Sequence, residues 1–213
     1  MLQGREQVET GVTQVVRASG RIVAAFLALA LAAAPAAAQY SAGYNFLKAV
    51  KDRDATKVTE ILAEPGTVVV NAKDQGNGEA ALHMVVRQRD YTWASFLLGK
   101  RANPNIQNRQ GESPLTIAAQ IGWVEGAELL LARGASVDLP NQRGETALIL
   151  AVHRRDMAMV SLLLRGGANP NRKDSLSGSS ALDYARQDGR SQAIVKLLEA
   201  KAAPARAVAG PKL

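Results

Sequence analysis

Apolar and polar positions recur along the middle of the chain with a period of about 33 residues. Gly78, Gly111, Gly144 and Gly178 each open a block with a short apolar run, a polar break, a longer apolar run and a polar loop. A leucine near the end of the longer run recurs with the same spacing, at Leu98, Leu131, Leu164 and Leu198. A period of this length indicates stacked structural repeats and not one globular core.

Each block predicts two helices, because its apolar positions have helical spacing and a break separates the two runs. The start of the first helix is clearest at Ser113, whose hydroxyl can accept free amide hydrogens, and at Pro114, whose missing N–H costs nothing there. Thr146 and Ser180 occupy the same capping position. Ala80 does not offer an acceptor, so we expect water to bind the amides of that helix start.

A single helix pair contains too few apolar residues to be stable alone. Burial of one leucine contributes roughly 1.5–3 kcal/mol, which cannot offset the entropy lost when a whole pair is ordered. We therefore predict an all-α solenoid of about five stacked helix-turn-helix units with projecting hairpin loops, in which atypical end units cap the stack. The predicted units span residues 44–74, 75–107, 108–140, 141–173 and 174–200.

The second helices are expected to end in a left-handed residue. Glycine stands at this place in Gly134 and Gly167, where positive φ costs little. The second unit has Arg101 there instead. If Arg101 keeps a positive φ, it should cost about 1 kcal/mol, and Arg101→Gly should raise the melting temperature.

The first 38 residues predict a secretory signal peptide and not a part of the fold. Arg17 and Arg21 precede an apolar run at 22–34, and the small residues 36–38 follow. We expect cleavage after Ala38. The alternative is a retained inner-membrane anchor, because the 17 residues 22–38 could just span a bilayer. The predicted stack occupies residues 39–201, and residues 202–213 predict a disordered basic tail.

Composition narrows the functional classes. The chain has 26 Lys and Arg against 19 Asp and Glu, which gives a net charge of +7, and it has no cysteine. Disulfides, cysteine metal sites and a cysteine nucleophile are therefore excluded. The basic residues are dispersed, and a nucleic-acid partner is not expected for an exported protein.

The repeated sequence motifs resemble those of the ankyrin repeat. Residues 111–119 read GESPLTIAA, which is similar to the family pattern G-x-T-P-L-H-x-A-A, and residues 134–138 resemble its G-A-x-x-N. Residues 144–148 and 167–171 match the same two patterns. The resemblance covers about residues 44–200. It implies two antiparallel helices per unit, a projecting hairpin loop, protein binding on the concave face, and no cofactor.

The chain departs from the family at two positions. The histidine after leucine survives only at His83. At the turn after the first helix, where the family has glycine, Arg89 and Arg155 stand in two units and only Gly122 keeps the glycine. The sequence therefore leaves the geometry of these turns open.

Two groups of candidate residues have a structural interpretation. By the family pattern His83 is a hydrogen-bonding framework residue and not a metal ligand, whereas His153 falls on the expected concave face, as a contact residue or a solvated one. One further repeat position could be a peptide groove but is better explained as core between neighbouring units; it is occupied by Met84, Ile117, Leu150 and Tyr184.

The candidate binding residues lie at positions that the family leaves variable, on the hairpin tips and the exposed side of the first helices. Arginines beside glutamates could bind a polar partner through charge-assisted hydrogen bonds. Equally, these charges could pair with each other across adjacent repeats, where exposed pairs contribute only about 0–1 kcal/mol each. The protein-binding candidates are Arg87, Arg109, Gln110, Glu112, Gln142, Arg143, Glu145, His153 and Arg154.

These observations predict a non-catalytic protein-interaction module of the bacterial cell envelope, periplasmic or secreted, monomeric, without cofactor or metal and without membrane insertion once the leader is cleaved. We find no phosphate loop, no G-x-S-x-G and no paired carboxylates in a cleft. The alternatives are a scaffold anchored at the inner membrane by an uncleaved leader and, less favoured, a hydrolase that uses surface carboxylates.

Overall fold

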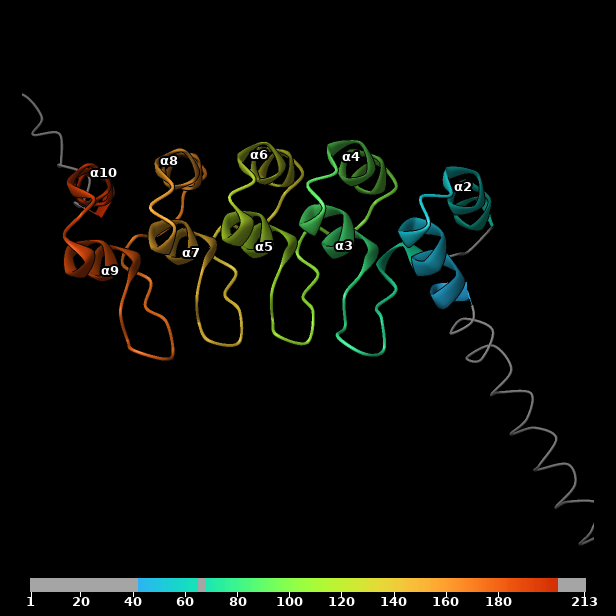
Figure 1. Ribbon diagram of the computed structural model, residues 1–213, viewed down its shortest axis with the longest axis horizontal. Coiled ribbons are helices and arrows are strands. Elements are labelled where there is room, and N and C mark those ends of the chain that lie inside the picture. The colour runs from blue at the N-terminus through green and yellow to red at the C-terminus, as the bar shows by residue number, and fades with distance from the viewer. Residues whose placement is uncertain (1–41, 65–67, 203–213) are drawn as a thin grey trace, which may run out of the picture. The chain divides into compact units, whose positions relative to one another are not determined.

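The computed structural model describes residues 42–64 and 68–202. Residues Phe46–Leu213 form one compact unit, and its described part is a row of helix pairs (Figure 1). Within the described residues there is no strand, only the isolated bridges Lys73–Ala80 and Lys173–Ser180, so the predicted all-α solenoid is confirmed. The predicted leader, residues 1–38, and residues 203–213 of the predicted tail lie outside the described residues. Ala202, the first residue of the predicted disordered tail, is instead the last residue of a helix.

The helices come in successive pairs joined by short turns. Residues 42–51 and α2 (Ala55–Ala63) form the first pair, and the short 3₁₀ helix η1 (Val69–Asn71) follows. The other pairs are α3 (Ala81–Arg87) with α4 (Tyr91–Gly99), α5 (Pro114–Ile121) with α6 (Val124–Ala132), α7 (Ala147–His153) with α8 (Met157–Arg165), and α9 (Ala181–Asp188) with α10 (Gln192–Ala202). Among these described helices, none is long and apolar enough to cross a membrane.

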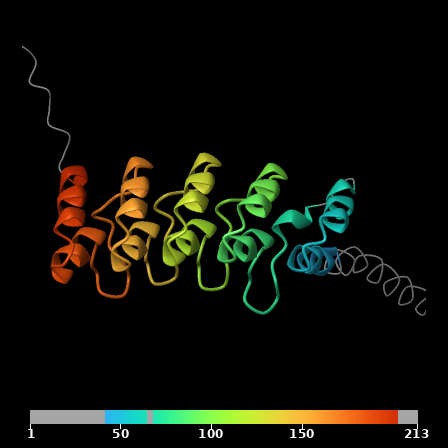
Figure 2. The ribbon, with the colours of Figure 1, turned by 45° about the horizontal axis from the view of Figure 1, so that its top comes forward.

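The pairs stack so that like helices meet. The first helices α3, α5, α7 and α9 contact one another in series, and the second helices α4, α6, α8 and α10 do the same. Figures 1 and 2 show the second helices in one row, the first helices in a neighbouring row, and the loops between pairs projecting on the far side of the first helices. The exposed side of the first helices and the loops therefore share one surface.

The core runs along the stack between the two rows, as the apolar periodicity predicts. Ile117 and Leu150, which the sequence places in a stripe between units, are 0% and 8% exposed and belong to this core. Met84 and Tyr184 of the same stripe are half-buried. Leu164 is 5% exposed, whereas its equivalent Leu131 is half-buried. Equivalent positions of the repeats thus face the same side of each unit, as the repeat register predicts.

The predicted helix starts are present. The hydroxyl of Ser113 accepts the amide hydrogen of Thr116 at 3.2 Å, with Pro114 in the first turn, and Thr146 and Ser180 cap their helices in the same way. At Ala80 the prediction of water-bound amides is wrong for one amide. The backbone amide of His83 donates to the Ala80 carbonyl at 2.9 Å.

The second helices end as predicted from the glycine pattern. Gly134 and Gly167 have φ of +86° and +92°, and Arg101 keeps the same left-handed conformation with φ +66°. The amide of Arg101 donates to the carbonyl of Leu98 at 3.1 Å. An arginine therefore occupies a backbone conformation that favours glycine.

Candidate functional site

The candidate site is the surface shared by the first helices and the hairpin loops, which we call the helix-and-hairpin face. Side chains join its two parts: the guanidinium of Arg87 on α3 donates to Glu79 and Glu112, one on each of two successive hairpins, at 2.7 Å each. Its exposed residues on the helices are Arg87, Gln88, Gln120, His153, Arg154 and Gln187, and those on the loops are Asn77, Arg109, Gln110, Gln142 and Arg143.

In each hairpin one amide or carboxylate side chain stabilises the turn by accepting hydrogen bonds from backbone amides. The side-chain oxygen of Asn108 accepts the backbone amides of Gln110 and Glu112, both at 2.9 Å, and Asn141 does the same for the next hairpin. Asp174 stabilises the hairpin of the fifth unit through three backbone amides. Sequence reasoning missed this role, although an Asn or Asp recurs three or four residues before each repeat glycine, which is the signal that could have revealed it.

Neighbouring hairpins are hydrogen-bonded in series. The backbone amide of Arg109 donates to Asn77 at 2.9 Å, and that of Gln142 donates to Gln110 at 3.0 Å. This close approach requires glycine: at Gly111, with φ +73°, an added Cβ would lie 2.7 Å from the amide nitrogen of Gln142. The hairpins therefore form one connected row and not independent loops.

Two of the predicted tip residues take part in this row with their side chains. The guanidinium of Arg109 donates to the carbonyls of Gly76, at 2.7 Å, and Gln75 in the preceding hairpin. The side-chain amide of Gln142 donates to the Arg109 carbonyl at 2.7 Å. Both side chains are exposed and at the same time tie one tip to the next, so their replacement would also loosen the row.

The glutamates that follow the repeat glycines are less available for contact with a partner than the sequence pattern suggests. The sequence pattern places Glu145 at an exposed position, but it is only 9% exposed, and its carboxylate accepts from Asn141 and Arg143, both at 2.8 Å. Glu112 is half-buried and is bonded to Asn108 and Arg87 in the same manner. Pairing across adjacent repeats is therefore present between Arg87 and Glu112, whereas Arg143 and Glu145 pair within one hairpin.

His83 is a framework residue, as predicted. It is fully buried, its Nδ1 accepts the amide hydrogen of Ala80 at 3.0 Å, and its Nε2 lies 3.0 Å from the carbonyl of Glu112 in the next unit. With Nδ1 as acceptor, Nε2 carries the proton and donates. Burial lowers the pKa of His83, which keeps the ring neutral. In the third unit Thr116 replaces it and accepts the Ser113 amide at 2.8 Å.

The turns between paired helices keep one backbone geometry where arginine replaces the glycine of the family. Arg53, Arg89 and Arg155 have φ of +58°, +55° and +55°, close to Gly122 at +67°. The aspartate after each arginine then caps the second helix, as Asp156 does by accepting the amide of Met159 at 3.0 Å. The turn geometry is thus maintained without glycine.

The same arginines reach forward to the next unit. The guanidinium of Arg53 contacts Asp90, that of Arg89 donates to the carbonyl of Ile121, and that of Arg155 binds Asp188 through two hydrogen bonds of 2.7 and 2.6 Å. The pair lowers the pKa of Asp188, first through the hydrogen bond from Arg155. These contacts explain why a strained arginine can stand where glycine would be easier.

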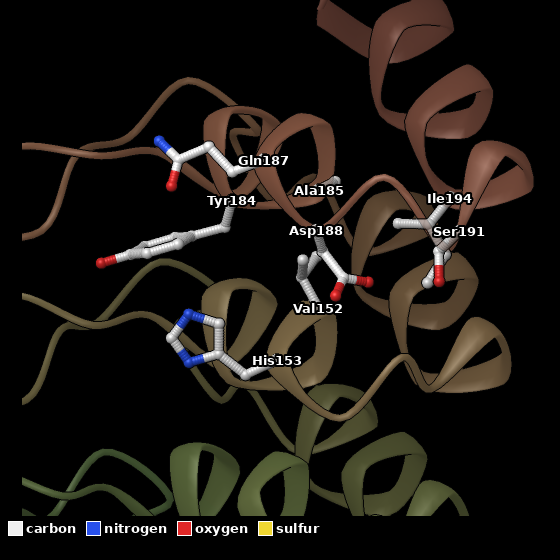
Figure 3. Close-up of a pocket in the computed structure, with 8 residues that line it drawn as sticks. All are labelled: Val152, His153, Tyr184, Ala185, Gln187, Asp188, Ser191 and Ile194. Carbon is white, nitrogen blue, oxygen red and sulfur yellow. The ribbon is translucent and has the colours of Figure 1, made fainter.

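A pocket of about 360 Å³ lies between the ends of α7 and α9 and the start of α10, in the fourth and fifth units (Figure 3). Val152, Ala185 and Ile194 line it with apolar surface and are 5%, 1% and 2% exposed. The rings of His153 and Tyr184 meet edge to face with centroids 4.4 Å apart. The remaining lining residues are polar: Gln187, Asp188 and Ser191.

The predicted residues are therefore distributed over the whole face. Gln110, Gln142, Arg109 and Arg143 lie on the tips, and Arg87 connects α3 to two hairpins. Of the nine, only His153 lines the pocket. The guanidinium of Arg154 lies against Gly122, within 3.3 Å of where a Cβ would be. Among the described residues, no group of His, Cys, Asp and Glu side chains could hold a metal ion.

A comparison with known families agrees with this geometry. The family model described as "Ankyrin repeats (3 copies)" matches residues 46–141 and again residues 124–206. Together the two matches extend over most of the chain and include all helices from α2 to α10.

Proposed function

Because this chain belongs to the ankyrin repeat family, whose repeats generally mediate protein–protein interaction, we propose that it binds a protein partner through the helix-and-hairpin face, the concave face of such a stack. The observation that carries the proposal is the connected row of hairpin tips, in which the amides of Arg109 and Gln142 donate to the preceding hairpin at 2.9 and 3.0 Å. A rigid row presents exposed side chains at fixed spacing, which reduces the entropy lost on binding.

The exposed residues of this face are polar and partly cationic, which suits a partner with carboxylates. Exposed Gln110, Gln120 and Arg154 offer donors, and the chain as a whole has a net charge of +7. Such a charge accelerates encounter with an acidic protein. Arg87 and Arg143 share their charge with glutamates, so they would contact a partner as part of these pairs.

Photo-cross-linking tests the face directly. A photoreactive phenylalanine derivative placed at Gln110 or Gln120 should trap the same partner protein in the cells that make the chain. The matched controls are Glu128 on α6 and Lys196 on α10, which are also exposed but lie on the second helices. Trapping of one protein from the control positions and not from the face positions would refute the proposed surface.

We further propose that the protein works in the bacterial cell envelope as a monomer, exported by the signal peptide of residues 1–38. The support is the order of charged, apolar and small residues in that segment. Mass spectrometry of the protein purified from its native cells should give Gln39 as the amino terminus. An intact leader in the membrane fraction would instead support the anchored scaffold.

A further inference from the structure

The hairpin of the second unit contains the one asparagine of the chain that precedes a glycine, Asn77 before Gly78. An asparagine side chain can react with the backbone nitrogen of the next residue. Glycine at that place favours the reaction, because it has no side chain to shield the nitrogen and its backbone turns freely. The residues before the other repeat glycines are Gln110, Arg143 and Ser177. Of these only the glutamine has a side-chain amide, and it would have to close a larger ring.

The reaction is an internal substitution at the side-chain amide of Asn77. The backbone nitrogen of Gly78 forms a bond to the side-chain carbonyl carbon, and the bond from that carbon to the amide nitrogen breaks. The proton lost by Gly78 is balanced by the proton that the leaving ammonia gains. Water then opens the cyclic imide at either of its carbonyls. One opening gives aspartate, and the other gives isoaspartate, in which the main chain continues through the side-chain carbon.

The folded hairpin already prepares the carbonyl of this reaction. Asn77 is exposed, and its side-chain oxygen accepts the backbone amide hydrogen of Glu79 at 2.9 Å. Negative charge develops on this oxygen when the nitrogen attacks, and a fixed N–H donor stabilises such charge. The same hydrogen bond directs the side chain forward along the chain, towards the nitrogen of Gly78.

The closed hairpin withholds the attacking nitrogen. The amide hydrogen of Gly78 is donated to the carbonyl of Asp74 at 3.0 Å, and Gly78 is buried although Asn77 is exposed. The nitrogen becomes a nucleophile only when a base removes this hydrogen. The reaction therefore requires that the hairpin opens locally, and its rate depends on the free energy of that opening.

The tip of this hairpin is held from one side only. Arg109 of the third unit donates its backbone amide to the Asn77 carbonyl at 2.9 Å and its guanidinium to the carbonyls of Gly76, at 2.7 Å, and Gln75. Among the described residues, the hydrogen bonds of residues 75–78 run only to this arginine and within the second unit. The next hairpin is bonded to a neighbour on both sides. The first hairpin of the row therefore opens most readily.

We propose that Asn77 is a site of spontaneous deamidation that Arg109 controls, protected while the arginine holds the tip and reactive when the tip opens. Isoaspartate turns the carbonyl that the Arg109 amide binds into a free carboxylate and moves the main chain to the side-chain carbon. The tip then cannot return to its place, so the modification removes the first link of the row. The inference rests on the hairpin geometry and holds whether or not the face binds a partner.

Timed incubation of the folded full chain in mildly alkaline buffer, followed by peptide mapping with mass spectrometry, measures the loss of ammonia at Asn77. A synthetic peptide of residues 72–82 and the full chain unfolded in urea give the rate without protection. The folded chain should react at least about tenfold more slowly than both and give aspartate and isoaspartate, which chromatography separates. A folded chain that reacts as fast as the peptide, or in which Asn77 remains intact throughout, overturns the proposal.

Three variants test the control by the arginine. Arg109→Ala removes the guanidinium hydrogen bonds to the second hairpin and should accelerate the reaction at Asn77 at least about threefold. The matched control is Arg143→Ala, because Arg143 is also an exposed tip arginine but binds Glu145 in its own hairpin, and it should leave the rate unchanged. Asn77→Gln introduces the residue of the next unit and should abolish the product. Circular dichroism checks that each variant is folded, and equal rates for the two arginine variants contradict the proposed control.

Discussion

Arg101→Gly is the substitution for which the structure supplies the sharpest stability prediction. Arg101 follows α4 with φ +66°, at the place where the third and fourth units have Gly134 and Gly167 with φ of +86° and +92°. Its side chain is exposed, and among the described residues none of the ion pairs includes it. The substitution therefore removes backbone strain without removing a charge pair.

The expected magnitude is the difference of two opposing effects. Relief of the left-handed conformation stabilises the folded state by about 1–2 kcal/mol. Glycine also increases the entropy of the unfolded chain, which costs about 0.4–1 kcal/mol. From the middle of each range the net gain is about 0.8 kcal/mol, which corresponds to a rise in melting temperature of about 2–3 °C for a domain of this size.

Thermal unfolding followed by far-ultraviolet circular dichroism measures the change. The reverse substitution Gly134→Arg is the matched control, because an added Cβ there meets no atom within 4 Å and the conformational cost alone remains. It should lower the melting temperature by a similar amount. An unchanged or lower melting temperature for Arg101→Gly would refute the reasoning, because the loop would then not need a left-handed residue.

Three further predictions concern the framework. Burial lowers the pKa of His83, so below about pH 6.5 the unfolded chain binds a proton that the folded chain does not bind. The free energy of unfolding should therefore be full above that pH and fall as the pH decreases towards the folded pKa. His83→Thr should reduce this fall, as measured by thermal unfolding between about pH 7.5 and 5.5. Leu164→Ala should cost about 2–5 kcal/mol in urea unfolding, and Leu131→Ala clearly less because Leu131 is half-buried; equal costs would contradict the packing described. Gly111→Ala should cost about 1 kcal/mol or more, seen as a lower melting temperature, since its Cβ would meet the Gln142 amide at 2.7 Å with φ +73°; an unchanged value would show that the hairpins can separate freely.

The candidate site shows why the solvent exposure of a charged side chain cannot be predicted from its position in the repeat alone. Glu145 and Glu112 sit directly after repeat glycines and look exposed, yet their carboxylates bind Asn141 and Asn108 inside the hairpins. Whether a charged residue on a tip meets solvent depends on the neighbouring side chains of the folded loop. Gln110, in contrast, is exposed as its position suggests.

The amino-acid sequence by itself determined the repeat period, the helix pairs and the side-chain caps at Ser113, Thr146 and Ser180, because these depend on residues within one turn or one unit. The helix start at Ser113 and Pro114, for example, is set by these local residues and not by the later path of the chain. Only the tertiary structure decided that Arg155 takes a glycine-like conformation and binds Asp188 in the next unit, and that Ser191 and His153 line one pocket. These features arise between units, where the shape and charge of two side chains distant in sequence are fitted together, so a pattern read along the chain does not contain them.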